Sequence, residues 1–240
     1  MKVKILHLYP KEMNLYGDRG NILALIRRLK WRGIEAEVIG HEPGDKIPDD
    51  INLIFGGGGQ DSNQALIEKD LRKIAPRLKD MIEDGVPALV VCGLYQLFGN
   101  YFETKDGDRI EGTHIMNLST KAGPSRLIGN IVISTRGFGE VVGYENHSGI
   151  TTLGDGVSAF GKVVVGYGNN GKDQTEGARY KNCIGTYLHG PILPKNPAVA
   201  DFLIKKALYT QGKEVKLKEL DDTIEMRAHR SAINRAKPNK

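Results

Sequence analysis

The sequence predicts an α/β fold in which helices flank a doubly wound, mostly parallel sheet, with an antiparallel, loop-rich section appended to it. Short apolar runs typical of buried strands alternate with longer runs that have helical spacing. One short run, Pro87–Val91, is entirely apolar, as expected for a strand covered on both faces of a parallel sheet. From about residue 110 to residue 187 the chain changes to short β-like runs separated by glycines. Strands that alternate with helices are joined by crossovers, which make neighbouring strands parallel.

The first part of the chain contains the elements of the parallel sheet. Each strand is a short apolar run, and each helix has apolar residues spaced three or four positions apart. Gly33 ends the first helix, and Pro76 predicts a break or kink in the second because proline lacks a backbone N–H donor. In chain order the elements are a strand at Val3–Tyr9, a helix with apolar positions from Ile22 to Leu29, a strand at Glu35–Ile39, a strand at Ile51–Phe55, a helix from about Gln64 to Glu83, and the strand at Pro87–Val91.

The second part predicts antiparallel strands, one strand that rejoins the parallel sheet, and two helices. The last β-like run, Cys183–Leu188, is the one expected to rejoin the sheet. A helix is predicted over Pro197–Tyr209, and an N-capped amphipathic helix over Asp221–Ala236. We therefore divide the chain into one domain over residues 1–212 and a basic helical extension over residues 213–240. The remaining β-like runs are His114–Leu118, Leu127–Thr135, Glu140–Tyr144 and Lys162–Tyr167.

Size and charge restrict the kinds of function that the chain can have. With 240 residues, 40% hydrophobic and 26% charged, it is long enough to bury a continuous core and is not typical of a disordered protein. The net charge is +5, of which residues 213–240 carry +3, with eight lysines and arginines against five acids. Phosphate binding needs a clustered basic face, so a nearly neutral body argues against nucleic-acid binding.

The sequence also predicts a cytoplasmic location without membrane insertion. The longest mostly apolar run, Val86–Phe98, is shorter than the roughly 20 residues that span a bilayer. Lys2 and Lys4 interrupt any signal-peptide core at the N-terminus. The chain has 2 cysteines, too few for a disulfide framework or a zinc site made of thiolates. A reducing compartment is therefore the natural one, and we expect no metal or other cofactor.

The strongest chemical signal is Cys92, which directly follows a buried strand and precedes Gly93 and a helical pattern. This order is typical of a nucleophile elbow, a sharp turn that exposes a reactive side chain at the sheet edge. A helix N-terminus favours the thiolate, and the Gly93 N–H would face the oxyanion that forms after attack on a carbonyl. The alternative is that Cys92 is a small hydrophobic core residue, which is the commoner role of a single cysteine. Cys183 lies inside a strand pattern and is interpreted as core.

Two further features support a catalytic site at the same edge of the sheet. The glycines at positions 56–59 follow a strand, where Gly57 or Gly58 could supply a second oxyanion donor. No Lys-Ser/Thr pair follows them, so they do not form a phosphate loop. His189 also ends a strand and could act as general base and imidazolium partner. The run from Gly166 to Gly171 fits a dinucleotide pattern, but no helix follows it and we reject that interpretation.

These motifs resemble class I (triad) glutamine amidotransferases of the cobyric acid synthase type. The resemblance depends on Cys92-Gly93-Leu94-Tyr95-Gln96 with Gly99, on the glycine loop, and on the strand ending in His189. It extends over about residues 1–210. Further motifs agree in order at residues 8–10, 13–21, 31–34, 143–149, 168–171 and 187–191.

The resemblance implies an enzyme that hydrolyses L-glutamine without a cofactor. Cys92 would attack the side-chain amide carbonyl, and His189 would protonate the departing ammonia and then activate water against the thioester. Arg126 falls on the family's substrate-binding arginine and could hold the α-carboxylate of glutamine. Gln96 would either contact the substrate or brace the turn. The resemblance also implies a heterodimer, whose Mur-ligase-like, ATP-dependent synthase subunit uses the ammonia to amidate D-glutamate in the stem peptide of lipid II.

The sequence departs from the family pattern at two positions. Pro191 stands where many members have the glutamate of the triad, so the third member must come from elsewhere in the fold or from the partner subunit. The resemblance favours the partner, which predicts low glutaminase activity for the isolated chain. Leu94 replaces a glycine at the turn and either narrows the site or is accommodated by a local shift. Asp18 and Asn21 are predicted to cap the first helix.

Two other interpretations stay open, and one pair of residues is assigned to the surface. A cysteine peptidase or deglycase-like hydrolase of related fold would also place a cysteine at such a turn. A non-catalytic scaffold subunit is supported only by the two departures. Glu145 and His147 could form a polar network near the site, but we expect a solvent-exposed pair in a β-loop.

Overall fold

The computed structural model describes residues 1–212 and 216–237. Its central sheet has six strands in the order β11-β12-β4-β3-β1-β2. All neighbours are parallel except the edge pair of β11 with β12, so the prediction of a doubly wound, mostly parallel sheet is confirmed. The strands are β1 (Lys2–Leu8), β2 (Glu35–His41), β3 (Leu53–Gly56), β4 (Ala88–Val91), β11 (Ala178–Tyr180) and β12 (Cys183–Thr186).

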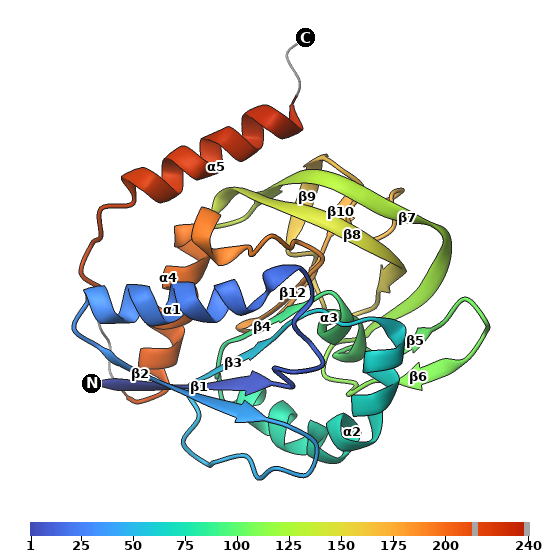
Figure 1. Cartoon of the computed structure of the whole chain (residues 1–240), viewed down its shortest axis with the longest axis horizontal. Coiled ribbons are helices and arrows are strands. Elements are labelled where there is room, and N and C mark those ends of the chain that lie inside the picture. The colour runs from blue at the N-terminus through green and yellow to red at the C-terminus, as the bar shows by residue number, and fades with distance from the viewer. Residues whose placement is uncertain (213–215, 238–240) are drawn as a thin grey trace.

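Helices cover both faces of this sheet (Figure 1). Helices α1 (Arg19–Trp31) and α4 (Pro197–Tyr209) pack against each other on one face, and α2 (Asp61–Glu83) lies on the other. The chain turns after α1 at Gly33, whose φ of +67° favours glycine. Helix α2 runs through Pro76 without ending, although the sequence predicts a break or kink there. The short α3 (Gly93–Leu97) follows β4 directly.

The glycine-rich section forms a second six-stranded sheet instead of extending the first. A long antiparallel pair dominates it and changes register between Ala122 and Leu127. The predicted run His114–Leu118 is not a strand before Leu118, and the short β5, β6, β10 and β11 are not predicted because they lack an apolar run. The strands are β5 (Tyr101–Glu103), β6 (Arg109–Glu111), β7 (Leu118–Thr135), β8 (Gly139–Leu153), β9 (Gly161–Val165) and β10 (Thr175–Glu176).

The C-terminal helix α5 (Thr223–Ala236) docks on the chain's own second sheet. Ala236 packs with Val132 and Val142 of β7 and β8, together with Ala232 and Ile233. Of the predicted extension, residues 213–215 and 238–240 lie outside the described residues. None of the described helices combines the length and the apolar character needed to cross a bilayer.

A buried ion-pair network fixes the start of α5 to the body of the chain. The Arg28 guanidinium on α1 donates to Asp201 of α4 at 2.7 Å and to Asp222 at 2.6 Å. Arg28 is buried, whereas both aspartates are partly exposed. Helices from three distant parts of the sequence are therefore joined through one arginine.

Candidate active site

The predicted site residues meet at one edge of the central sheet. Register pairs Val90 of β4 with Gly56 of β3, and Val91 of β4 with Thr186 of β12. Because these strands are parallel, the segments that follow them start at the same edge. Those segments carry the glycine loop, Cys92 and His189.

Cys92 lies at a sharp turn between β4 and α3. Its φ of 51° and ψ of −105° are strained for a side-chain-bearing residue. Two hydrogen bonds hold this conformation: the Cys92 N–H donates to Thr186 O at 2.8 Å, and its carbonyl accepts from Gln96 N at 2.9 Å. The side chain is only 8% exposed. The backbone thus has the conformation expected of a nucleophile elbow.

Leu94, where the family pattern has glycine, is accommodated by a glycine on the neighbouring strand. A Cβ atom on Gly56 would clash with the Leu94 side chain, so the leucine fills the space above this glycine. Leu94 is fully buried and does not line the cavity beside Cys92. The departure therefore changes packing beneath the loop and does not narrow the site.

His189 is fully buried and held through its backbone. Its N–H donates to Tyr144 O at 2.8 Å, and its carbonyl accepts from Tyr144 N at 3.1 Å. The side chains of His189 and Cys92 converge over Gly58. A Cβ atom there would lie 2.9 Å from the ring Cε1 and 3.2 Å from the cysteine Cβ. Only glycine leaves room for both groups, which explains one position of the glycine loop.

Asp18 supplies a carboxylate to the imidazole from within the same chain. Its Oδ1 lies 3.2 Å from Nδ1 of His189, and its Oδ2 accepts the Gly58 N–H at 2.8 Å. The prediction that Asp18 caps α1 is wrong, because its side chain makes no capping hydrogen bond. Asn21 does not cap either, since its Oδ1 accepts the Leu193 N–H at 2.9 Å. The structure therefore places a carboxylate of the same chain beside the imidazole.

The electrostatic surroundings of His189 favour its protonated form. Burial lowers the pKa of His189, but the neighbouring Cys92 sulfur and the Asp18 carboxylate raise it by more, so the net pKa is about 10. The ordinary value of histidine is about 6.5. The imidazolium therefore stabilises the fold fully below about pH 6.5, and this contribution is lost as the pH rises through about 10.

Removing the Cys92 sulfur should make His189 easier to deprotonate. We expect the pKa of His189 to fall in Cys92→Ala, because the sulfur is one of the two neighbouring groups that raise this pKa. NMR of the histidine side-chain nitrogens across a pH titration measures this value in both proteins. The ring of the exposed His114 is the control, and its signals should be the same in the two proteins. An unchanged His189 titration would show that the sulfur does not contribute to its charge.

A cavity of about 380 Å³ lies beside Cys92. Arg126 of β7 reaches this cavity, where its Nε donates to Asn146 Oδ1 at 2.7 Å and its terminal nitrogen to Asn146 O at 2.8 Å. Burial raises the pKa of Asp61, which lines the same cavity, and the charge of Arg126 partly offsets this rise. The lining includes Tyr16, Gly59, Asp61, Cys92, Gln96 and Arg126.

The glycine loop presents a different amide to the cavity from those expected. Gly58 donates its N–H to Asp18, and a Cβ on Gly57 would clash with Met13 O, so both shape the loop. Gly59 lines the cavity, and its nitrogen lies 3.0 Å from the place that a Cβ on Gly93 would occupy. Within the described residues the Gly59 N–H makes no hydrogen bond. The Gly59 amide therefore lies beside Gly93, the residue that follows Cys92.

Gln96 lines the cavity and also stabilises the turn at Cys92. Its Oε1 accepts from Gln64 Nε2 at 2.9 Å, and its Nε2 donates to Tyr187 Oη at 3.1 Å. Gln64, on α2, was not singled out from sequence, because a glutamine in a helical pattern carries no signal of its own. It is buried, and its Oε1 has no hydrogen-bond partner in the described chain.

Glu145 and His147 are buried, which contradicts the expectation of an exposed pair. Glu145 accepts hydrogen bonds from the N–H groups of Tyr167 at 2.7 Å and Gly168 at 2.9 Å. The His147 ring stacks on the Tyr187 ring, with 3.5 Å between the ring centroids, and His147 lines the cavity. The glycine run that mimics a dinucleotide pattern therefore binds a carboxylate of its own chain.

Comparison with known proteins connects this site to a family. The profile of the CobB/CobQ-like glutamine amidotransferase domain matches residues 4–197. The chain is 44% identical over 240 residues to lipid II isoglutaminyl synthase (glutamine-hydrolyzing) subunit GatD of Staphylococcus aureus, covering 100% of this chain and 98% of that protein. The protein of the same name from Streptococcus pneumoniae is 38% identical over 229 residues, which cover 93% of this chain and 87% of that protein. A solved glutamine amidotransferase shares the fold, with a TM-score of 0.58 at 15% identity over 85% of this chain and 98% of that one.

Proposed function

The chain belongs to the CobB/CobQ-like glutamine amidotransferase family, and on that premise we propose that it hydrolyses L-glutamine to glutamate and ammonia through a thioester on Cys92. The observation that carries the proposal is the convergence of Cys92 and His189 over Gly58, with Asp18 behind the imidazole. A buried cysteine of the hydrophobic core would not have a strained turn, an imidazolium beside it and a cavity before it.

Each group has a step in the proposed reaction. The Cys92 thiolate attacks the side-chain amide carbon of glutamine, and the amides of Gly59 and Gly93 stabilise the oxyanion. His189 donates the proton on Nε2 to the amide nitrogen, and ammonia leaves as the thioester forms. The neutral ring then takes a proton from water, whose oxygen attacks the thioester and releases glutamate. Asp18 holds the ring through Nδ1 and stabilises the imidazolium that both steps use.

Arg126 is proposed to bind the α-carboxylate of glutamine, which predicts a loss of affinity in Arg126→Met. A charge-assisted pair is worth roughly 1.5–3 kcal/mol, so KM should rise about tenfold to a hundredfold. The turnover number should change little, because the carboxylate lies far from the reacting bond. Initial rates of glutamate release over a range of glutamine concentrations measure both constants. An unchanged KM in this variant would show that Arg126 does not bind the α-carboxylate of glutamine.

The partner is proposed from the names of the relatives. Both are subunits of lipid II isoglutaminyl synthase, which supports the same assignment here. The ammonia would then pass to a Mur-ligase-like, ATP-dependent subunit that amidates D-glutamate of the lipid II stem peptide. The glycine loop of this chain lacks the Lys-Ser/Thr pair of a phosphate loop, which fits a division of labour between two subunits.

Glutamate and ammonia measured together test the proposed function. We expect equal amounts of both from glutamine, and no cleavage of peptide substrates. Peptide cleavage without glutamine hydrolysis would favour the cysteine peptidase alternative. A chain that releases neither product, alone or with the ATP-dependent subunit, would favour the scaffold alternative.

A further inference from the structure

Helix α1 has positive charge on two sides, and carboxylates of residues 1–212 and 216–237 pair with only one of them. The helix contains arginines and lysine but no aspartate or glutamate. On the inner side, Arg28 is paired with the two aspartates described above. On the outer side, Arg19, Arg27 and Lys30 are exposed, and no carboxylate of the described residues lies within 4.0 Å of their charged groups.

The outer side of α1 also exposes large apolar side chains. Leu23 is 55% exposed and Trp31 is 48% exposed. Arg19, Leu23, Arg27 and Trp31 are spaced four residues apart. Cations and apolar side chains therefore alternate along one stripe of the helix. The Arg27 guanidinium lies 5.9 Å from the Trp31 ring centroid. Ile224, at the start of α5, adds a side chain that is 80% exposed.

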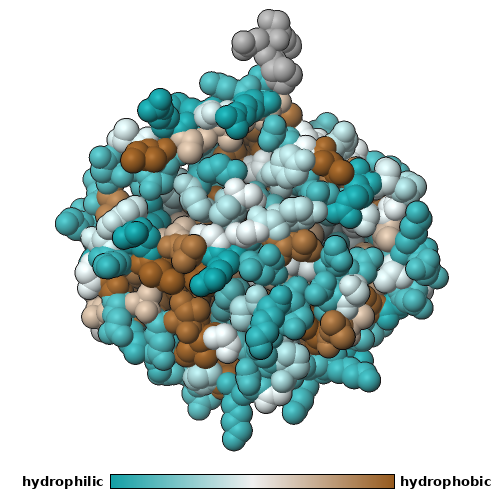
Figure 2. All heavy atoms as spheres, viewed as in Figure 1, coloured by the Kyte–Doolittle hydropathy of each residue, from teal (hydrophilic) through white to brown (hydrophobic). Residues whose placement is uncertain are grey.

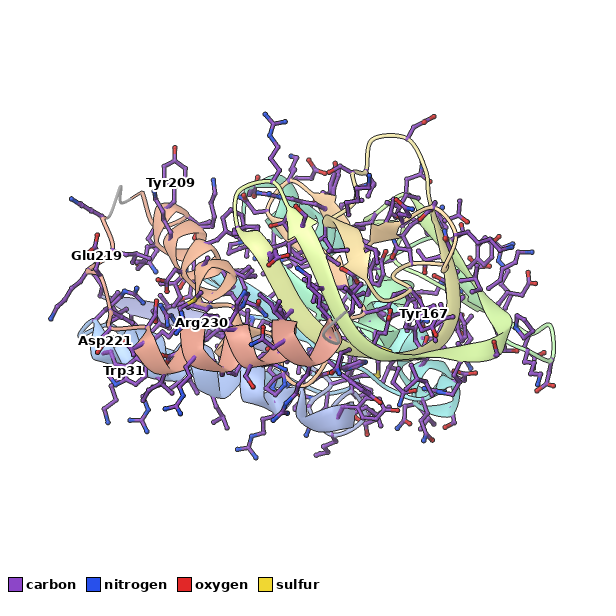
Figure 3. The ribbon with its side chains drawn as sticks, turned by 90° about the horizontal axis from the view of Figure 1, so that it is seen from above. Trp31, Tyr167, Tyr209, Glu219, Asp221 and Arg230 are labelled. Carbon is purple, nitrogen blue, oxygen red and sulfur yellow. The ribbon has the colours of Figure 1, made fainter. Side chains whose placement is uncertain are left out.

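An apolar groove of about 280 Å³ runs between α1, the turn η2 (Leu193–Lys195) and the start of α5. Figure 2 shows hydrophobic surface gathered where α1 runs across the front of the molecule. Figure 3 shows Trp31 at the end of α1 that lies near Asp221, where α5 approaches. Exposed apolar patches rimmed by charge are typical of protein interfaces. The groove is lined by Leu23, Ala24, Arg27, Trp31, Leu193 and Glu225, among others.

The same face adjoins the catalytic residues. Asp18 directly precedes α1, and Pro191, which follows His189 by two positions, packs against Gly20 of α1. Tyr16 is exposed and lines the catalytic cavity. Its ring lies edge-on to the His189 ring, with 4.9 Å between the ring centroids. A protein bound along α1 would therefore lie beside the mouth of the cavity from which ammonia leaves.

We infer that the outer face of α1 and its groove form the docking surface for the ATP-dependent synthase subunit. The matching surface on that subunit carries an apolar anchor that fills the groove and carboxylates that pair with the outer cations of α1. Ammonia must reach its acceptor before it escapes into solvent, which places the acceptor subunit beside the cavity mouth. This inference rests on the proposed function, because that function names the subunit.

Charge reversal and polar substitution on this face test the inference in the full-length chain. We expect Leu23→Asp and Arg27→Glu each to weaken binding of the purified ATP-dependent subunit at least tenfold, and the double variant at least thirtyfold, in isothermal titration calorimetry. Glutamate release by the chain alone should stay at the wild-type rate, because neither residue touches the cavity. Leu66→Asp and Arg72→Glu are matched controls on α2, where Leu66 is 71% exposed, and should bind as the wild type does.

Each outcome of this experiment is decisive. Wild-type affinity in Leu23→Asp and Arg27→Glu would overturn the inference, and so would equal weakening by the α2 controls. If the wild-type chain hydrolyses glutamine but does not bind the subunit, the inference falls while the glutaminase function stands. Thermal melts of each variant separate a lost contact from a lost fold.

Discussion

Cys92→Ala is expected to lower the rate of glutamate release from glutamine by about four to six orders of magnitude. The residue that forms the covalent bond cannot be replaced by its neighbours, so only the weak catalysis by the oxyanion donors would remain. The substitution removes one sulfur atom from a side chain that packs at the edge of the core, so the fold should persist. Enzymatic detection of glutamate at saturating glutamine measures the loss.

Cys183→Ala is the matched control for this prediction. Cys183 is fully buried in β12, and burial raises the pKa of its thiol to about 12, so it stays protonated and unreactive near neutral pH. We expect this variant to retain the wild-type turnover number with slightly reduced stability. A large loss of activity in Cys183→Ala, or activity in Cys92→Ala, would contradict the assignment of the nucleophile.

Asp18→Asn is expected to lower the turnover number about 10⁴-fold with little change in KM. Asparagine has the same shape but no charge, so it can neither stabilise the imidazolium nor fix the tautomer in which Nδ1 carries the proton. In the variant the pKa of His189 should fall, because the Asp18 carboxylate is one of the groups that raise it. Steady-state kinetics and the NMR titration of the ring measure the two effects.

The same variant decides where the triad carboxylate comes from. Asp155→Asn, in an exposed loop, controls for a general effect of the substitution. Both proteins are assayed alone and with the ATP-dependent subunit. If Asp18 is the third member, the subunit should not rescue Asp18→Asn. Wild-type turnover of Asp18→Asn in the complex would show that a carboxylate of the partner fills this role.

The sequence allowed the sheet and two members of the site to be predicted, because both depend on local patterns. Apolar runs fix the parallel strands, and the rule that ligands bind at the carboxyl ends of such strands brings Cys92 and His189 together. Arg126 was found only through resemblance, since an exposed arginine has no pattern of its own. It nevertheless lines the same cavity as Cys92.

The missed features depend on contacts between distant residues. Asp18 lies 171 positions from His189, and in the sequence it has the usual setting of a helix cap. The burial of Glu145 requires the backbone amides of the loop at Tyr167 and Gly168, which pattern analysis cannot place. The choice of Gly59 over Gly58 depends on which amide Asp18 already occupies. In each case a polar group is fixed by a partner that only the folded chain brings near.

The central claim is that glutamine enters the cavity and is attacked at Cys92. Mass spectrometry of peptides from the chain, after treatment with a glutamine-analogue electrophile, tests it most directly. We predict one modified residue, Cys92, with labelling slowed by added glutamine and with Cys183 unmodified. Label on Cys183, or labelling of Cys92 that glutamine does not slow, would contradict it.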